Sequence, residues 1–271
     1  MQKSLFIILA SVAVFYCAIC LVMFVRQRSF IYFPQRMDDK EIALIEKAMG
    51  FEPWKAQDGT PFGWKMEAAN ESRRSFILFH GNGGLALERT ELVSKLREAD
   101  PYCSIYLFEY PGYANMAGSP SENAIVALAC KAADDLTVTT QKPIYIIGES
   151  LGTGVSCAVA TQKPAAISGL LLLTPFNSLV GAAATRYAFL PVSLLLKERY
   201  DSANNLKAFH KPVAIIVAEK DTTVPAKLGI ALFDGYKGPK QLLSVPNCEH
   251  NEVADLVDVP EFRRLLQFLQ N

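Results

Sequence analysis

The sequence predicts an α/β domain with a mostly parallel, doubly wound sheet, preceded by one apolar N-terminal helix. Strand-like apolar runs alternate with helical segments through most of the chain. These runs are apolar nearly throughout, which is typical of parallel strands covered by helices on both faces. A further stretch of 21 residues near the N-terminus (5–25) carries no charged side chain. It is long enough to cross a membrane as a helix.

Composition limits the kinds of partner that the chain can have. Its 271 residues include 27 Lys and Arg against 27 Asp and Glu, so the overall charge favours neither nucleic acid nor an acidic ligand. The six cysteines are too few for a disulfide scaffold and form no metal-binding pattern. We therefore expect no metal or organic cofactor. The four cysteines outside the apolar segment are expected to be free thiols that turnover does not need: Cys103, Cys130, Cys157 and Cys248.

The N-terminal segment is predicted to be an uncleaved membrane anchor over residues 1–28, followed by one domain over residues 29–271. At about 1.5 Å per residue, residues 5–25 span about 30 Å, the thickness of the hydrocarbon core. A cleaved signal peptide is the alternative because Lys3 precedes the run, but signal peptides usually have apolar regions of only about 7–15 residues. A buried soluble helix is a third interpretation. Lys3 favours an inside N-terminus and Arg26 and Arg28 oppose it, so the side of the membrane stays open, with a lean toward export.

After the anchor, periodicity predicts the elements in order. Residues 38–49 form a helix with an apolar side. The Asp58-Gly59 turn lies between two extended stretches and predicts a hairpin. The predicted strands are 76–79, 104–109, 144–148, 170–174, 213–218 and 242–245. The predicted helices are 88–99, 122–139, 151–162, 226–233 and 261–269.

One interval interrupts this alternation. Residues 175–205 separate two predicted strands and include the apolar sequence RYAFLPVSLLLKERYD. It is interpreted either as an ordinary packed helix pair or as a small lid at the mouth of a pocket. The second interpretation rests on the tendency of such sheets to build their sites beyond the strand C-termini.

A Gly-x-Ser-x-Gly motif provides the candidate nucleophile. Ser150 is flanked by Gly148 and Gly152, with the strand-like PIYIIG before it and a predicted helix after it. A serine at a strand-to-helix turn of this kind is the context of a nucleophile elbow. The alternative interpretation is a serine that only caps the helix.

A serine nucleophile needs a base, and the chain has three histidines. His80 precedes Ser150, and His210 comes just before a strand, whereas His250 follows the last strand. Asp221 follows the strand 213–218 and would orient the imidazole, which produces the chain order Ser, Asp, His. Glu219 is the nearest competitor for this role. The predicted triad is Ser150, Asp221 and His250.

Acyl transfer also needs donors for the developing oxyanion. The amide of Leu151, next to the nucleophile, is one expected donor. The other should come from a loop after an earlier strand, and the HGNGG loop meets this condition. We expect the backbone amide of Asn82 to be this donor, with Gly83 as the alternative.

Several segments in this order resemble the α/β-hydrolase superfamily, and its BEM46-like or ABHD13/ABHD17-like branch in particular: HGNGG, EYPGYANMAGSPSE, GESLGTG, TPFNSL, DTTVP and EHNE. The similarity covers roughly residues 28–271. The resemblance implies the same triad, and an N-terminal membrane anchor is common in that branch. The chain departs from the branch where Pro111 replaces an arginine and Ala114-Asn115 replaces a glycine, which puts the conformation of that loop in question.

The resemblance and the motifs together predict a membrane-anchored serine hydrolase that cleaves acyl esters or thioesters through an acyl-enzyme. Its substrate would be a small or lipid-derived acyl compound, or an acylated protein. Two alternatives remain: amide or peptide hydrolysis by the same triad, and a non-catalytic ligand-binding module with this fold. Neither nucleic acid nor a cofactor is expected as a partner.

Overall fold

One eight-stranded sheet organises the chain in the computed structural model, which describes residues 2–68 and 71–270. The strand order is β1-β2-β4-β3-β5-β6-β7-β8. Strand β2 pairs antiparallel with both β1 and β4, and the remaining neighbours are parallel. The strands are β1 (Glu52–Lys55), β2 (Pro61–Met66), β3 (Arg74–Phe79), β4 (Cys103–Phe108), β5 (Ile144–Glu149), β6 (Ile167–Leu173), β7 (Val213–Ala218) and β8 (Lys240–Val245). The predicted doubly wound, mostly parallel sheet is confirmed.

The strand order changes direction at β3, which lies between β4 and β5. Strand β3 pairs with β4 on one side and β5 on the other, so the chain reverses its direction of progress across the sheet here. Such a switch point opens a crevice at the C-terminal ends of the strands. The HGNGG loop follows β3 and Ser150 follows β5, so the topology brings both to this crevice.

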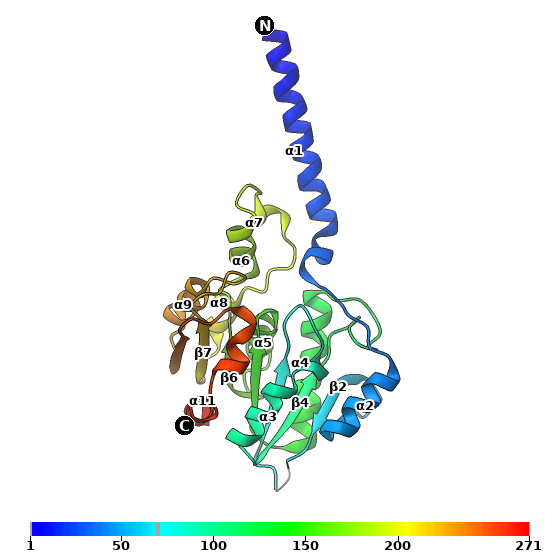
Figure 1. The fold of residues 1–271 in the computed structure, drawn as a ribbon, viewed down its shortest axis with the longest axis vertical. Coiled ribbons are helices and arrows are strands. Elements are labelled where there is room, and N and C mark those ends of the chain that lie inside the picture. The colour runs from blue at the N-terminus through cyan, green and yellow to red at the C-terminus, as the bar shows by residue number, and fades with distance from the viewer. Residues whose placement is uncertain (1, 69–70, 271) are drawn as a thin grey trace.

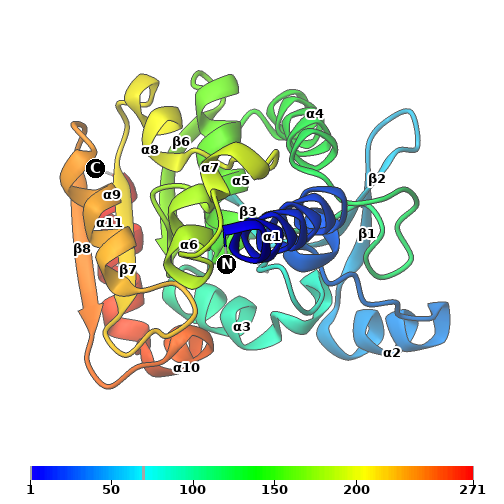
Figure 2. The ribbon, with the colours of Figure 1, turned by 90° about the horizontal axis from the view of Figure 1, so that it is seen from above.

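Helices cover both faces of the sheet. In Figure 2, α3 (Thr90–Ala99) lies on one side of the strands, while α4 (Glu122–Thr140) and α5 (Leu151–Gln162) lie on the other. Helix α11 (Val259–Gln270) packs against α3, and α4 packs against α5. The further helices in the domain are α2 (Asp39–Met49), α9 (Ala226–Gly235) and α10 (Val253–Leu256), with 3-10 turns at Ala86–Glu88, Leu206–Ala208 and His250–Glu252.

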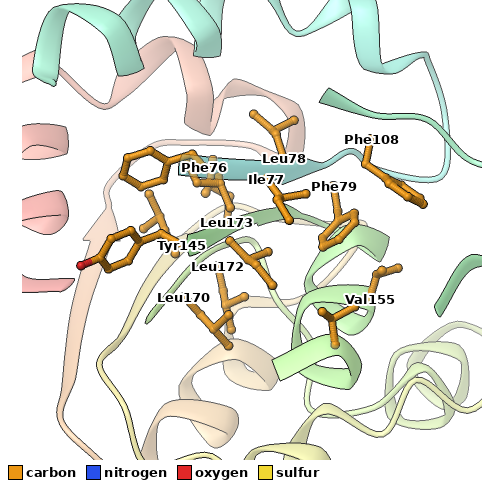
Figure 3. Packing of buried hydrophobic residues seen from close by; sticks show 14 of the residues in the cluster. Phe76, Ile77, Leu78, Phe79, Phe108, Tyr145, Val155, Leu170, Leu172 and Leu173 are labelled. Carbon is orange, nitrogen blue, oxygen red and sulfur yellow. The ribbon is translucent and has the colours of Figure 1, made fainter. Parts of the chain in front are cut away.

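The core lies between the central strands and these helices. Strands β4 and β7 are buried along their whole length, and β3 and β6 nearly so, because the apolar residues point to both faces. Figure 3 shows Phe79 beside Phe108, with ring centroids 5.2 Å apart at a steep angle, and Phe76 stacked on Tyr145 at 5.4 Å. These edge and offset contacts are the arrangements that aromatic pairs prefer.

The predicted hairpin at Asp58-Gly59 is also present, joining β1 to β2. Gly59 has φ +83°, in the left-handed region where a side chain is strained. Asp58 accepts a hydrogen bond from the Thr60 amide at 3.0 Å and pairs with Lys131 on α4. The turn therefore follows from its residue types.

Helix α1 (Gln2–Ile31) projects from the domain, as Figure 1 shows. It is long and apolar enough to cross a membrane, and none of its apolar window is buried against the rest of the protein. A core helix of a soluble domain would be mostly covered, so the exposure argues against that alternative.

The insertion between β6 and β7 contains three short helices: α6 (Leu179–Arg186), α7 (Val192–Leu195) and α8 (Ser202–Asn205). Figure 1 shows α6 and α7 rising beside the lower part of α1, on the same side of the domain. The insertion therefore lies over the C-terminal edge of the sheet, next to the crevice. Its function as a lid stays a prediction.

Candidate active site

Ser150 occupies a strained turn between β5 and α5. Its backbone has φ 52° and ψ −114°, a combination that L-residues with a side chain rarely adopt. The surrounding structure holds it there. The Ser150 amide donates to the Leu173 carbonyl at 2.9 Å, and the Ser150 carbonyl accepts from both the amide and the hydroxyl of Thr153. Strain that persists under such constraint is typical of functional sites, so the turn favours a role for the serine beyond capping.

The two glycines of the motif are required by the close approach of neighbouring elements. A Cβ on Gly152 would lie 2.6 Å from the Phe79 carbonyl carbon and 2.8 Å from the His80 carbonyl oxygen. A Cβ on Gly148 would lie 2.7 Å from the Gly152 carbonyl oxygen. These neighbours are backbone atoms that cannot turn aside. The Gly-x-Ser-x-Gly spacing therefore lets α5 begin directly against the end of β3.

The structure brings the three predicted triad residues together. His250 Nε2 lies 2.8 Å from Ser150 Oγ, and His250 Nδ1 lies 2.6 Å from Asp221 Oδ2. The other carboxylate oxygen of Asp221 accepts from the amides of Thr223 and Val224 at 2.8 and 2.7 Å. Because Asp221 is almost fully buried, these donors fix its rotamer. The arrangement can move a proton from the serine hydroxyl to the imidazole.

The competing residues lie elsewhere. Glu219 is exposed and accepts from Ser244 on β8 at 2.8 Å. His210 is exposed and precedes β7, so it lies at the N-terminal ends of the parallel strands, away from Ser150. His80 is completely buried and faces Glu109 instead of the serine.

The HGNGG loop packs beside the serine. A Cβ on Gly81 would contact the Ser150 Cβ at 3.5 Å, so the loop backbone passes directly over the nucleophile. Within residues 2–68 and 71–270, no acceptor takes a hydrogen bond from the backbone amide of Asn82 or of Leu151. Both residues line the cavity at Ser150. The two amides predicted as oxyanion donors are therefore near the serine and unused by the fold. Gly83 also lines the crevice and stays the alternative to Asn82.

A buried contact between His80 and Glu109 supports this loop, and the sequence motifs do not reveal it. His80 Nε2 lies 2.8 Å from Glu109 Oε1, and both side chains are fully buried. Glu109 also accepts from the amides of Ala86 and Tyr110 at 3.0 Å. The Tyr110 ring stacks on the His80 imidazole at 4.0 Å. Because one carboxylate joins both ends of the loop, the pair holds the path of residues 80–86.

The N-terminal helix reaches the same loop, another contact that sequence patterns do not indicate. Asn82 Nδ2 donates to the carbonyl of Ile31, the last residue of α1, at 3.0 Å. The Asn82 carbonyl accepts from the Phe33 amide at 3.3 Å and from the Tyr113 hydroxyl at 2.8 Å. Asn82 is thus held on three sides by residues outside its own loop.

Tyr113 belongs to the loop where the sequence departs from the branch. Ala114 adopts a left-handed conformation with φ +43°, although it has a side chain. Its amide donates to the Gln35 carbonyl at 2.8 Å, which offsets part of the strain. The turn is thus left-handed at Ala114, and Tyr113 reaches Asn82 from it.

Two cavities meet at Ser150, and they differ in chemistry. One has a volume of about 490 Å³ and is mainly apolar, with walls from α1, α6 and the segment that contains α7. The other has a volume of about 440 Å³ and holds charged side chains, among them Glu88, Arg89 and Glu149. Arg89 Nε pairs with Glu149 at 2.7 Å, and its guanidinium donates to the Gly83 carbonyl at 3.2 Å. An apolar group and a polar group can therefore lie in two different cavities that both reach the serine.

Comparison with known proteins places this chain in a family. The Mycobacterium tuberculosis protein Rv2307c, described as uncharacterized, is 31% identical over 256 residues, which cover 93% of this chain and 89% of that protein. Protein bem46 of Schizosaccharomyces pombe is 28% identical over 192 residues, 68% of this chain and 64% of that one. The chain belongs to the BEM46-like branch of the α/β-hydrolase superfamily. The family and the enzyme class predicted from the sequence, an ester hydrolase, are confirmed.

Two further similar proteins are a lipase and an esterase. The lysophosphatidylserine lipase ABHD12 of Xenopus tropicalis is 26% identical over 200 residues, which span 67% of this chain and about half (51%) of that lipase. Among solved structures, the Pyrococcus furiosus esterase Pf2001 superposes with a TM-score of 0.64 at 16% identity, covering 89% of this chain and 97% of that one. At such low identity the superposition shows the fold alone. No model of a protein family matches the chain.

Proposed function

We propose that this α/β hydrolase is a membrane-anchored serine hydrolase that cleaves acyl esters or thioesters by way of an acyl-enzyme. The observation that carries the proposal is the continuous contact from Asp221 through His250 to Ser150, at 2.6 and 2.8 Å, on a strained turn beside two unused amides. Each part has a role in acyl transfer, and the parts converge on one point in the crevice.

The proposed reaction has two steps. Ser150 Oγ attacks the carbonyl carbon while its proton passes to His250 Nε2, and Asp221 stabilises the imidazolium that forms. The amides of Leu151 and Asn82 hold the oxyanion. The proton on His250 then passes to the leaving group, the bond to that group breaks, and the acyl-enzyme remains. Water, deprotonated by His250, attacks the acyl-enzyme and releases the carboxylic acid together with free Ser150.

The two cavities suggest how an acyl ester lies. The apolar cavity of about 490 Å³ suits a hydrocarbon chain, and the charged cavity suits a polar leaving group. Lipases and esterases among the similar proteins, such as the lysophosphatidylserine lipase of Xenopus tropicalis, act on ester substrates. We propose the same general class, lipid-derived acyl esters, for this chain.

The test uses the full-length protein in detergent and a fluorophosphonate probe that reacts with activated serines. We expect the wild type to be labelled and to hydrolyse p-nitrophenyl acyl esters, and Ser150→Ala to lose both. Turnover should fall by a factor on the order of 10⁴ or more, as in other serine triads. The matched control is Ser94→Ala, because this exposed serine lies on α3 and its hydroxyl bonds only the Thr90 carbonyl of the same helix.

Two other outcomes would decide against the proposal. A folded wild type that neither labels nor turns over would exclude the hydrolase and favour a ligand-binding module. Labelling with faster turnover of aminoacyl amides than of esters would keep the triad but replace the ester substrate with an amide.

A further inference from the structure

The apolar cavity has walls from two segments far apart in the sequence, α1 and the insertion. Met23, Gln27 and Phe30 of α1 line it on one side, and Leu190 and Leu195 of the insertion line it on the other. Ser150 also lines this cavity. A helix that only tethered the domain would have no reason to form part of this wall.

Hydrogen bonds fasten the insertion to α1 along much of the helix. The Tyr16 hydroxyl donates to the Phe189 carbonyl at 2.9 Å. One turn before the end of α1, Gln27 donates to the Leu195 carbonyl at 3.2 Å and accepts from the Lys197 amide at 2.6 Å. From residue 16 to residue 27 the helix rises by about 16 Å at its usual 1.5 Å per residue. Much of the insertion therefore lies at the depth of the apolar run of α1.

The part of the insertion at this depth is apolar and exposed. Residues 187–196, called here the apolar segment, contain no charged side chain. Leu194 is 81% exposed and Phe189 65% exposed, although burial of such a side chain is worth roughly 1.5–3 kcal/mol. Exposed to water, these side chains would favour aggregation, whereas in hydrocarbon their exposure is favourable.

Basic residues surround the base of this apolar region. Arg186 and Lys197 flank the apolar segment, and Arg26 and Arg28 follow the apolar run of α1. The Lys197 ammonium lies 4.3 Å from the centre of the Phe24 ring, and Arg28 pairs with the buried Glu198 at 2.7 Å. Long basic side chains at the edge of an apolar surface are typical of proteins at the lipid headgroup level.

We infer that the apolar segment inserts into the leaflet that holds the C-terminal half of α1, and that single-chain acyl esters enter the apolar cavity sideways from the hydrocarbon of that leaflet. The inference rests on the proposed membrane anchor and hydrolase. It adds a second membrane contact and names the source and class of the substrate. The ester carbonyl reaches Ser150 while the chain stays between α1 and the apolar segment, and the polar group leaves through the charged cavity.

Insertion is tested with tryptophan fluorescence in vesicles of phosphatidylcholine and phosphatidylglycerol. We compare full-length Leu194→Trp with Val138→Trp, which is similarly exposed (68%) but lies at the far end of α4. The two native tryptophans are buried and contribute the same background to both. Acyl-brominated lipids should quench Leu194→Trp and leave Val138→Trp unchanged. Equal quenching of the two variants, or none at position 194, would overturn the insertion.

Sideways entry is tested by filling the cavity from the side of α1. Met23→Trp points a larger ring into the cavity, whereas Val25→Trp places the same ring on the exposed side of the helix. We expect the ratio of long-chain monoacylglycerol hydrolysis to short-chain ester hydrolysis to fall by at least about tenfold in Met23→Trp, a usual effect of a misfit in an apolar pocket. It should not change in Val25→Trp. Equal ratios in the two variants would overturn the route.

The outcomes separate this inference from the proposed function. If the fluorophosphonate probe does not label the wild type, the proposed hydrolase activity is wrong, whatever the quenching shows. If the probe labels the wild type but lipids do not quench the tryptophan at position 194, the proposed hydrolase stands and the membrane contact of the apolar segment is wrong.

Discussion

The strain at Ser150 predicts an unusual order of stability among variants at this position. Replacement by alanine or by glycine removes the hydroxyl and its 2.8 Å contact with His250, so this loss is common to both variants. They differ only in the Cβ atom. Alanine keeps it at φ 52° and ψ −114°, where a side chain costs about 1–3 kcal/mol, and glycine does not.

A second effect acts in the opposite direction. Glycine gives the unfolded chain more conformational freedom, which lowers the stability of a protein by roughly 0.5–1 kcal/mol relative to alanine. Taking the middle of both ranges, Ser150→Gly should be more stable than Ser150→Ala by about 1 kcal/mol. For a protein of this size that difference corresponds to about 2–4 °C in the melting temperature.

Thermal unfolding followed by circular dichroism, with both variants in the same detergent, measures this difference. The same pair of substitutions at Ser94 is the control, because Ser94 lies within the regular helix α3. There glycine should be less stable than alanine by about 1 kcal/mol. If the alanine variant at position 150 melts at the same temperature as the glycine variant, or higher, the turn is not strained and the argument fails.

Two further predictions concern packing and thiol chemistry. Gly152→Ala should destabilise the protein by roughly 1–3 kcal/mol and reduce turnover, because the new Cβ would force the backbone of Phe79 and His80 away. Gly235→Ala, where the space is open, should change stability little, and equal melting temperatures for the two variants would contradict this. Burial raises the pKa of Cys157 to about 12, so at pH 8 this thiol stays protonated. Iodoacetamide should therefore modify Cys157 far more slowly in the folded than in the unfolded protein, as measured by mass spectrometry. Equal rates would show that this thiol is not buried.

Most of the fold could be predicted from the sequence because the signals are local. The sequence predicts a helix over residues 151–162, the bounds that α5 has, since glycines and a strand mark its beginning. The insertion was harder: residues 175–205 contain three short helices with irregular connections, and no clear period marks them. The four cysteines of the domain are free, as predicted, and all are buried.

The contacts among Ser150, His250 and Asp221 could also be expected, because the three histidines leave few combinations and the chain order of this fold class selects one. The pair of His80 and Glu109 was missed because its residues are 29 positions apart and each alone resembles a loop residue. Only the parallel pairing of β3 with β4 brings the residues that follow the two strands together. Contacts of this type depend on the register of the sheet, which the apolar pattern of a strand does not contain.

Gln27 illustrates the same limit in α1, where this residue contacts the insertion. In the sequence it is one polar residue shortly after the apolar run, but in the structure it is 8% exposed and its amide both donates to and accepts from the insertion. Four residues later the Ile31 carbonyl accepts from Asn82, the proposed oxyanion donor. A rigid helix turn joins these two contacts, so a displacement of α1 relative to the domain would disturb the wall of the cavity and the oxyanion loop together. The position of α1 relative to the domain and the geometry at Ser150 are therefore coupled through residues 27–31.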